Sequence, residues 1–147
     1  MGKKVFILAA TLLCSQYFHA NAQSIVRNGV IETATASIPR NGLDISSSEK
    51  AVFSISAGTV ISSNTIEGLK AVLVRSADSI YVYGNMTAVS VSSGDILKTG
   101  QKIGELSRTC NDKYLLHYEI WRGASNERPL LLSYFDTKKV LNLNGPN

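Results

Sequence analysis

Few side chains of this 147-residue protein could carry out chemistry. The chain has two histidines, His19 and His117, and two cysteines, Cys14 and Cys110. His19 and Cys14 lie in an N-terminal segment that we expect to be removed, which leaves one histidine and one cysteine. Any mechanism that needs two imidazoles within one processed chain is thereby excluded, and so is an intramolecular disulfide.

Cys110 and His117 could form a nucleophile and its general base. A reactive cysteine normally sits at a helix N-terminus beside an oriented histidine, whereas these two residues lie in an expected loop and strand. We therefore expect Cys110 to be a buried, unreactive thiol.

Residues 1–22 have the features of a secretory signal peptide. Lys3 and Lys4 precede an apolar run over residues 5–13, and Ala-Asn-Ala at residues 20–22 matches a small-x-small cleavage site. The apolar run is about half of the roughly 20 residues that a membrane span needs. We expect export to the periplasm or the extracellular side of the envelope, with no transmembrane segment.

Lipid modification of Cys14 is the alternative to cleavage after residue 22. Leu13 occupies the position before the cysteine where lipidation sites usually have a small residue, which favours cleavage. Cleavage would lower the formal net charge from +4 to +2, because Lys3 and Lys4 leave with the signal peptide. No dense basic run remains, so we expect no nucleic-acid partner.

Removal of 22 of the 147 residues leaves enough chain for one compact domain. We expect residues 23–39 to form an N-terminal strand or linker and residues 40–136 to form the domain. The pattern is lost after Asp136, so residues 137–147 are expected to be a loosely held, flexible tail.

Short β-branched runs separated by Gly, Ser and Asn are typical of an all-β domain. Gly58 should interrupt one run as a turn or bulge, and the segment 91–104 should be a tight reversal that turns Ile96 and Leu97 inward. The expected strands cover residues 29–37, 51–63, 70–76, 79–85, 87–91, 102–106 and 115–122.

Four blocks in a consistent order carry a resemblance to a known family. Residues 40–45 read Arg-Asn-Gly-Leu-Asp-Ile, residues 56–60 Ser-Ala-Gly-Thr-Val, residues 83–91 Tyr-Gly-Asn-Met-Thr-Ala-Val-Ser-Val, and residues 115–120 Leu-Leu-His-Tyr-Glu-Ile. They resemble the His-x-Gly-Leu-Asp-Ile, Ala-x-Gly-Thr-Val, Tyr-x-His-Leu and His-x-His-Phe-Glu blocks of the LytM/M23 peptidoglycan metallopeptidases. The resemblance implies an antiparallel β-sheet sandwich with a barrel-sandwich-like hairpin core.

The resemblance also implies a set of site positions. Its zinc-ligand positions correspond to Arg40, Asp44 and His117, and its two catalytic positions correspond to Asn85 and Leu115. A catalytic zinc needs three protein ligands and one open position for water. Arginine has only donors and keeps its proton, and leucine can neither take nor give one. Asn85 could polarise a carbonyl but could not act as a general base.

The exchange of histidine for Arg40 suggests a specific replacement for the metal. If the guanidinium points into the site, it should pair with the carboxylate of Asp44. The simpler interpretations are a solvated Arg40, an Asp44 that satisfies turn backbone groups, and a His117 that is a hydrogen-bonded structural residue. Glu119 is expected to be a supporting residue, and Trp121 to pack on the sheet.

Residues 117–123 especially resemble the degenerate LytM domains of murein hydrolase activators, which switch on a separate amidase. Those proteins usually have a long coiled coil before the domain, and this chain shows none.

We therefore expect an exported pseudoenzyme with no cofactor that binds peptidoglycan or a murein hydrolase such as an amidase. The degenerate groove of such a protein would contain Arg40, Asp44, Asn85, Leu115 and His117. The first alternative is a zinc-dependent peptidoglycan endopeptidase with an atypical metal site, in which a partner chain lends a ligand to Asp44 and His117. The second is a purely structural interaction domain.

Overall fold

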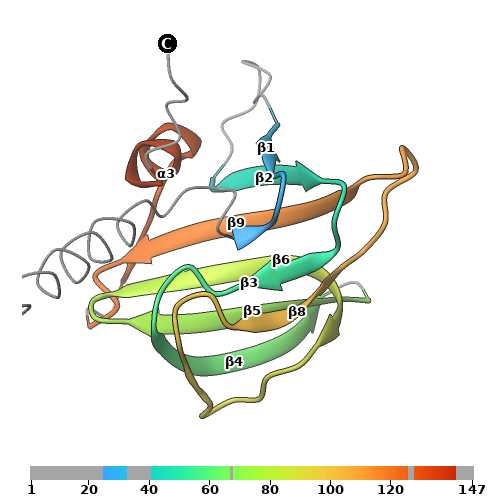
Figure 1. Ribbon diagram of the computed structural model, residues 1–147. Helices are drawn as coiled ribbons and strands as arrows, with labels where there is room; N and C mark the ends of the chain where they lie inside the picture. Colours follow the sequence, from blue (N-terminus) through green and yellow to red (C-terminus); the bar gives the residue numbers. More distant parts are fainter. Residues whose placement is uncertain (1–24, 33–40, 67, 126–127, 142–147) are drawn as a thin grey trace, which may run out of the picture.

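The computed structural model describes residues 25–32, 41–66, 68–125 and 128–141. These residues form ten strands and one short helix (Figure 1). The elements are β1 (Val30–Ile31), β2 (Leu43–Ser47), β3 (Ala51–Phe53), β4 (Gly58–Ile66), β5 (Leu69–Ser76), β6 (Ser79–Val89), β7 (Ile96–Leu97), β8 (Lys102–Leu106), β9 (Tyr114–Arg122), β10 (Leu130–Leu131) and α3 (Tyr134–Val140).

The strands belong to one antiparallel sheet in the order β1-β2-β9-β6-β5-β4-β7. The long strand β6 is shared, because it pairs with β9 over residues 79–84 and with β8 over residues 86–89. β8 in turn pairs with β3, and this pair lies across one face of the main sheet (Figure 1). The predicted all-β, antiparallel fold is confirmed, with α3 as a small addition.

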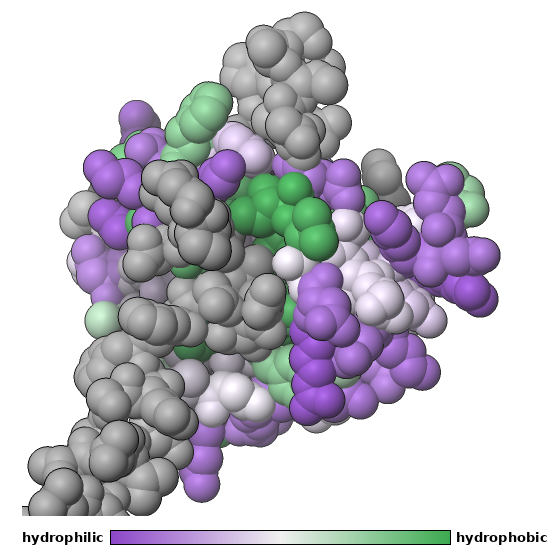
Figure 2. Space-filling view, turned by 45° about the horizontal axis from the view of Figure 1, so that its top comes forward, coloured by the Kyte–Doolittle hydropathy of each residue, from purple (hydrophilic) through white to green (hydrophobic). Residues whose placement is uncertain are grey.

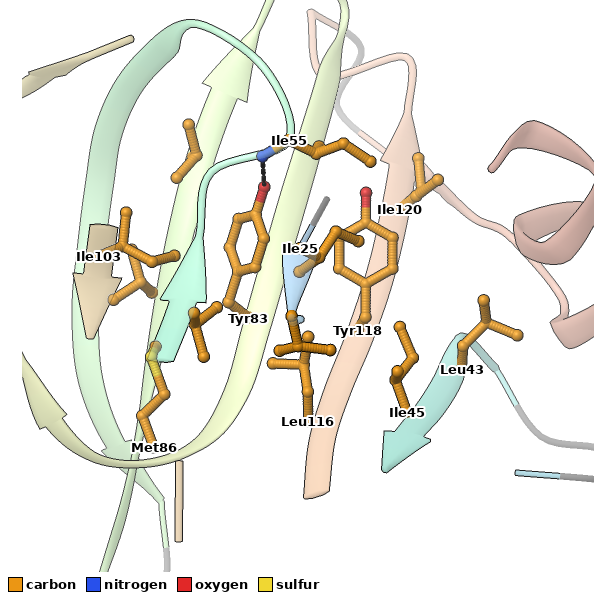
Figure 3. Packing of buried hydrophobic residues seen from close by; sticks show 14 of the residues in the cluster. Ile25, Leu43, Ile45, Ile55, Tyr83, Met86, Ile103, Leu116, Tyr118 and Ile120 are labelled. Atoms are coloured by element: carbon orange, nitrogen blue, oxygen red, sulfur yellow. Dashed lines mark hydrogen bonds between the residues drawn. The ribbon is translucent and has the colours of Figure 1, made fainter. Parts of the chain in front are cut away.

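The core lies between the main sheet and the β3–β8 pair. Strand β9 shows why its sequence folds this way, since Leu116, Tyr118 and Ile120 are buried and the residues between them are only partly covered. Such alternation is the pattern of a strand with one face on a core. Tyr83 of β6 stands beside Tyr118, and its hydroxyl accepts a hydrogen bond from the Ile55 amide at 3.1 Å (Figure 3).

Several strand boundaries differ from the prediction. The expected strand over residues 51–63 is two strands, β3 and β4, and Gly58 begins the second. The two expected strands at 79–85 and 87–91 form the single strand β6, which contains a bulge between Met86 and Ala88. A bulge adds a residue to one strand without ending the pairing. Because the extra residue interrupts the alternation of side chains, the sequence pattern predicts the end of a strand there.

Both ends of the described domain are packed more closely than expected. Ile25 and Val26, assigned to an N-terminal strand or linker, are fully buried in the core. The flexible tail predicted from residue 137 is wrong for residues 137–141, where Thr137 and Leu141 are buried in and after α3. Ser133 caps this helix by accepting a hydrogen bond from the Asp136 amide, a local signal for a helix start.

Two further expectations about burial are wrong. Leu97 is buried as predicted, but Ile96 is 81% exposed, because consecutive residues of strand β7 point to opposite faces. Cys110 is exposed in the loop between β8 and β9, where a buried thiol was expected.

Hydrophobic residues gather near the centre of the view in Figure 2, and hydrophilic residues lie to their right. None of the helices in the described part of the chain is long and apolar enough to cross a membrane.

Candidate functional site

The site lies on the face of the main sheet that points away from the core. Leu115, His117, Glu119 and Trp121 alternate with the buried residues of β9, so their side chains share this outer face. His117 lies directly opposite Asp44 of β2 on one side and Gly84 of β6 on the other. Strand register therefore brings together residues that are far apart in the sequence.

His117 is bonded at both ring nitrogens. Its Nδ1 is 2.8 Å from Asp44 Oδ1, and its Nε2 is 2.9 Å from Glu119 Oε1. A ring nitrogen must carry a proton to donate to a carboxylate, so two carboxylate partners favour the doubly protonated, positively charged ring.

This geometry raises the pKa of His117. Its pKa is raised from 6.5 to about 9, first by the hydrogen bond to Asp44 and then by the bond to Glu119, against the opposing effect of partial burial. The hydrogen bond to His117 in turn lowers the pKa of Glu119. At neutral pH the three residues are an imidazolium held between two carboxylates.

Glu119 extends this arrangement to Trp121. While Glu119 Oε1 bonds to His117, Oε2 accepts a hydrogen bond from Trp121 Nε1 at 2.8 Å. Asp44, His117, Glu119 and Trp121 therefore form one continuous row of hydrogen-bonded side chains, which we call the carboxylate–imidazole row. Glu119 was expected to be a supporting residue and Trp121 to pack on the sheet, although the period of two along β9 already placed both beside His117.

The donor atoms of this row are a poor match for a catalytic zinc ion. Two ligand atoms of one tetrahedral zinc lie roughly 3.3 Å apart, given bond lengths of about 2.0–2.1 Å. The 2.8 Å between His117 and Asp44 is instead a direct hydrogen bond, and the Glu119 bond is on the opposite side of the ring. Among the residues that the structure describes, no three His, Cys, Asp or Glu side chains are grouped to hold a metal.

The other predicted site residues are placed as follows. Leu115 shares the outer face of β9, opposite Ser46, and carries no group that could take part in proton transfer. Asn85 follows Gly84 and has a φ of 64°, a left-handed conformation that is uncommon outside glycine. Arg40 lies outside the described residues, so its pairing with Asp44 stays a prediction.

Two hollows meet at His117. The first, with a volume of about 370 Å³, is lined by residues that include Glu32, Asn41, Asp44, His117 and Tyr134.

The second hollow, of about 430 Å³, lies over β4, β5, β6 and β9. Its lining residues are Asn64, Leu69, Lys70, Ala71, Leu73, Val82, Gly84, Asn85, His117, Glu119 and Trp121. We call it the sheet-face hollow. Gly84 leaves space in the hollow because it has no side chain, and a Cβ atom at this position would fit, since it would come no closer than 3.5 Å to His117.

Comparison with known proteins agrees with this fold. The family model of peptidase family M23 matches residues 39–129. A solved structure of cbpa from L. salivarius REN is 28% identical, covers 64% of this chain and 69% of its own, and has a TM-score of 0.51. No curated protein matches the chain.

Two further structures share the fold at lower identity. Lysostaphin is 17% identical with a TM-score of 0.63, over 89% of this chain and 58% of its own. The structure of the SpoIIQ–SpoIIIAH pore-forming complex is 19% identical with a TM-score of 0.60, and the match covers 86% of this chain and 96% of the chain in that complex. Since the family model spans more than half of the sequence, this chain belongs to peptidase family M23.

Proposed function

We propose that this chain is an exported, non-catalytic M23 domain that binds peptidoglycan through the outer face of its sheet. The observation that carries the proposal is the engagement of both ring nitrogens of His117 by carboxylates. A histidine needs a free, unprotonated nitrogen to bind zinc, and the bonds to Asp44 and Glu119 favour the protonated ring instead.

The residue types at the remaining family positions support the same conclusion. Leu115 stands where the resemblance implies an acid or base, and Arg40 where it implies a third ligand. A zinc peptidase needs a bound zinc ion, which lowers the pKa of a water molecule on the metal. It also needs a side chain that accepts the proton which this water gives up. This chain lacks at least one component of each of these two steps.

The open face of the sheet supports a binding role. The two hollows on either side of His117 fall within the size range of ligand sites, about 300–1,000 Å³, and the larger one combines apolar and polar lining residues. An open, hollowed face beside positions that have leucine and arginine is suited to recognition without turnover.

Co-sedimentation with purified sacculi tests the binding role. The wild type should pellet with sacculi, and Gly84→Val should pellet much less, because the new side chain enters the sheet-face hollow while its Cβ fits beside His117. The matched control is Thr87→Val, which adds the same residue at an exposed position of the same strand. Equal pelleting of wild type and Gly84→Val would contradict the proposed binding face.

Metal analysis of protein purified without chelator tests the absence of catalysis. We expect less than stoichiometric zinc and no release of soluble fragments from sacculi, with or without added zinc. Stoichiometric zinc together with fragment release, both lost in Asp44→Ala, would establish the alternative of a zinc endopeptidase. Recovery of an amidase from envelope extracts, without retention on sacculi, would instead favour a regulator of a hydrolase.

A further inference from the structure

We propose that the sheet-face hollow binds a pyranose ring of a glycan strand, so that this domain recognises the sugar part of its ligand. The inference rests on the proposed function and assigns a ligand class to one part of the binding face. It depends on which atoms in the hollow are still able to bond.

The side-chain N–H donors on the β9 side of the hollow are already engaged, and each oxygen of Glu119 has one partner and can accept a further hydrogen bond. Both nitrogens of His117, both oxygens of Glu119 and the indole N–H of Trp121 bond within the carboxylate–imidazole row. Because its N–H is its only polar group, Trp121 can offer a ligand only the carbon atoms of its ring. This side of the hollow is therefore available for van der Waals and stacking contacts.

The floor of the hollow is apolar. Ala71 and Leu73 of β5 and Val82 of β6 line it, and Gly84 leaves space where other residues would place a side chain. Aromatic and aliphatic surfaces of this kind suit a flat ligand with C–H groups on its face.

The free polar groups lie at the other side. The side chains of Asn64, Asn85 and Lys70 line the hollow, and none of them makes a hydrogen bond or ion pair with another residue that the structure describes. Two amides can both donate to and accept from hydroxyl or acetamido groups, and the ammonium group of Lys70 can donate to them. Asn85 is held in its left-handed conformation, at φ 64°, at the edge of this hollow.

Sheet geometry favours a sugar over an extended peptide. A peptide strand usually binds by pairing its backbone with the open edge of a sheet. The hollow instead lies over β4, β5, β6 and β9, and the three strands that form most of it, β5, β6 and β9, each pair with neighbours on both sides. A pyranose ring has its polar groups around its rim and C–H groups on its faces, which matches an apolar floor beside two amides.

The charges of the hollow point the same way. The carboxylate of Glu119 is engaged by direct hydrogen bonds with His117 and Trp121, and Lys70 is the other formally charged side chain among the described lining residues. A neutral N-acetylated sugar therefore meets no strong field of either sign.

The only tryptophan of the chain gives a direct assay, because Trp121 lines the hollow. Titration of the processed protein with triacetylchitotriose should change the Trp121 emission in a saturable way. Gly84→Val should weaken the apparent affinity at least tenfold, and Thr87→Val should leave it unchanged. Asn85→Gly, which removes one amide but keeps the left-handed backbone, should weaken it about fivefold.

A second titration, with the tetrapeptide stem free of sugar, separates the two ligand classes. If triacetylchitotriose leaves the emission unchanged while the tetrapeptide shifts it in a Gly84-dependent way, the sugar assignment is wrong and the proposed function stands. If neither ligand binds and sacculi are not retained, the proposed function fails as well. An emission change that persists in Gly84→Val would also overturn the assignment, since binding would then lie elsewhere.

Discussion

Replacing Asp44 with asparagine should lower the pKa of His117 from about 9 towards its ordinary value of 6.5. The hydrogen bond to Asp44 is the largest cause of the raised pKa and the bond to Glu119 is the second. Asp44→Asn should therefore lower the pKa more than Glu119→Gln, because a neutral amide no longer stabilises the positive charge of the imidazolium.

The raised pKa of His117 also makes the stability of the protein depend on pH. Since the folded pKa, about 9, lies above the ordinary value of 6.5, the stabilisation is fully present below pH 6.5 and is lost as the pH rises through 9. Without screening, a rise of this size corresponds to about 3 kcal/mol.

Solvent screening reduces this contribution. The His117 side chain is 35% exposed, so we expect roughly 1–2 kcal/mol. The pKa of Glu119 is lowered from 4.5, so its contribution is present above pH 4.5 and is lost as the pH falls through its folded pKa. The window of full stabilisation therefore runs from about pH 4.5 to 6.5.

Two measurements test this reasoning. A proton NMR titration of the processed chain contains the signal of one histidine, and its midpoint gives the pKa of His117 in the wild type and in Asp44→Asn. Urea unfolding at pH 6 and pH 10 should show that the wild type loses about 1–2 kcal/mol more than His117→Gln. An NMR titration midpoint of the wild type near pH 6.5, or the same pH dependence of unfolding free energy in the wild type and His117→Gln, would refute a protonated His117 in the carboxylate–imidazole row.

Four further outcomes follow from the structure. Because the carboxylate–imidazole row is held by direct hydrogen bonds, EDTA should leave the melting temperature unchanged; a drop of several degrees would reveal a structural metal. Gly104→Ala should destabilise the protein, because its Cβ would lie 2.4 Å from the Ala88 carbonyl oxygen, whereas Gly84→Ala should be tolerated. The urea midpoint of Gly104→Ala should therefore be lower than that of Gly84→Ala, and equal midpoints would contradict this packing. Leu116→Ala should cost about 2–5 kcal/mol of unfolding free energy, since Leu116 is fully buried, and a loss below about 1 kcal/mol would place it outside the core. Cys110 should react with a thiol reagent at its full stoichiometry without denaturant, as an exposed cysteine does, and protection until unfolding would contradict its position.

Of the strands that position the site, β6 and β9 could be predicted from local pattern, whereas β2, which carries Asp44, falls outside every expected strand. The run that forms β9 alternates apolar and polar residues, so both the strand and its buried face were predictable. The break expected between residues 85 and 87 was wrong, because the bulge near Asn85 depends on pairing with β8 and cannot be recognised from local composition.

The burial of residues at the two ends of the domain could not be predicted from local sequence patterns. Ile25, Val26 and Leu141 are buried because they meet the core of a sheet formed by distant segments, and their own neighbours in the sequence give no periodic signal. The exposure of Cys110 has the same origin, since its loop extends beyond the strands that it connects.

The sequence alone determined to which family the chain is similar and which residue types stand at the positions that correspond to the family's site. Residue type decides that leucine cannot transfer a proton and that arginine cannot bind zinc, whatever the fold around Leu115 and Arg40. The tertiary structure decided which groups His117 bonds to, because Asp44 is 73 residues away and reaches it only through the register of β2 with β9. The row of four side chains and the sheet-face hollow beside it depend on that register, since a shift by one residue would turn these side chains to the opposite face.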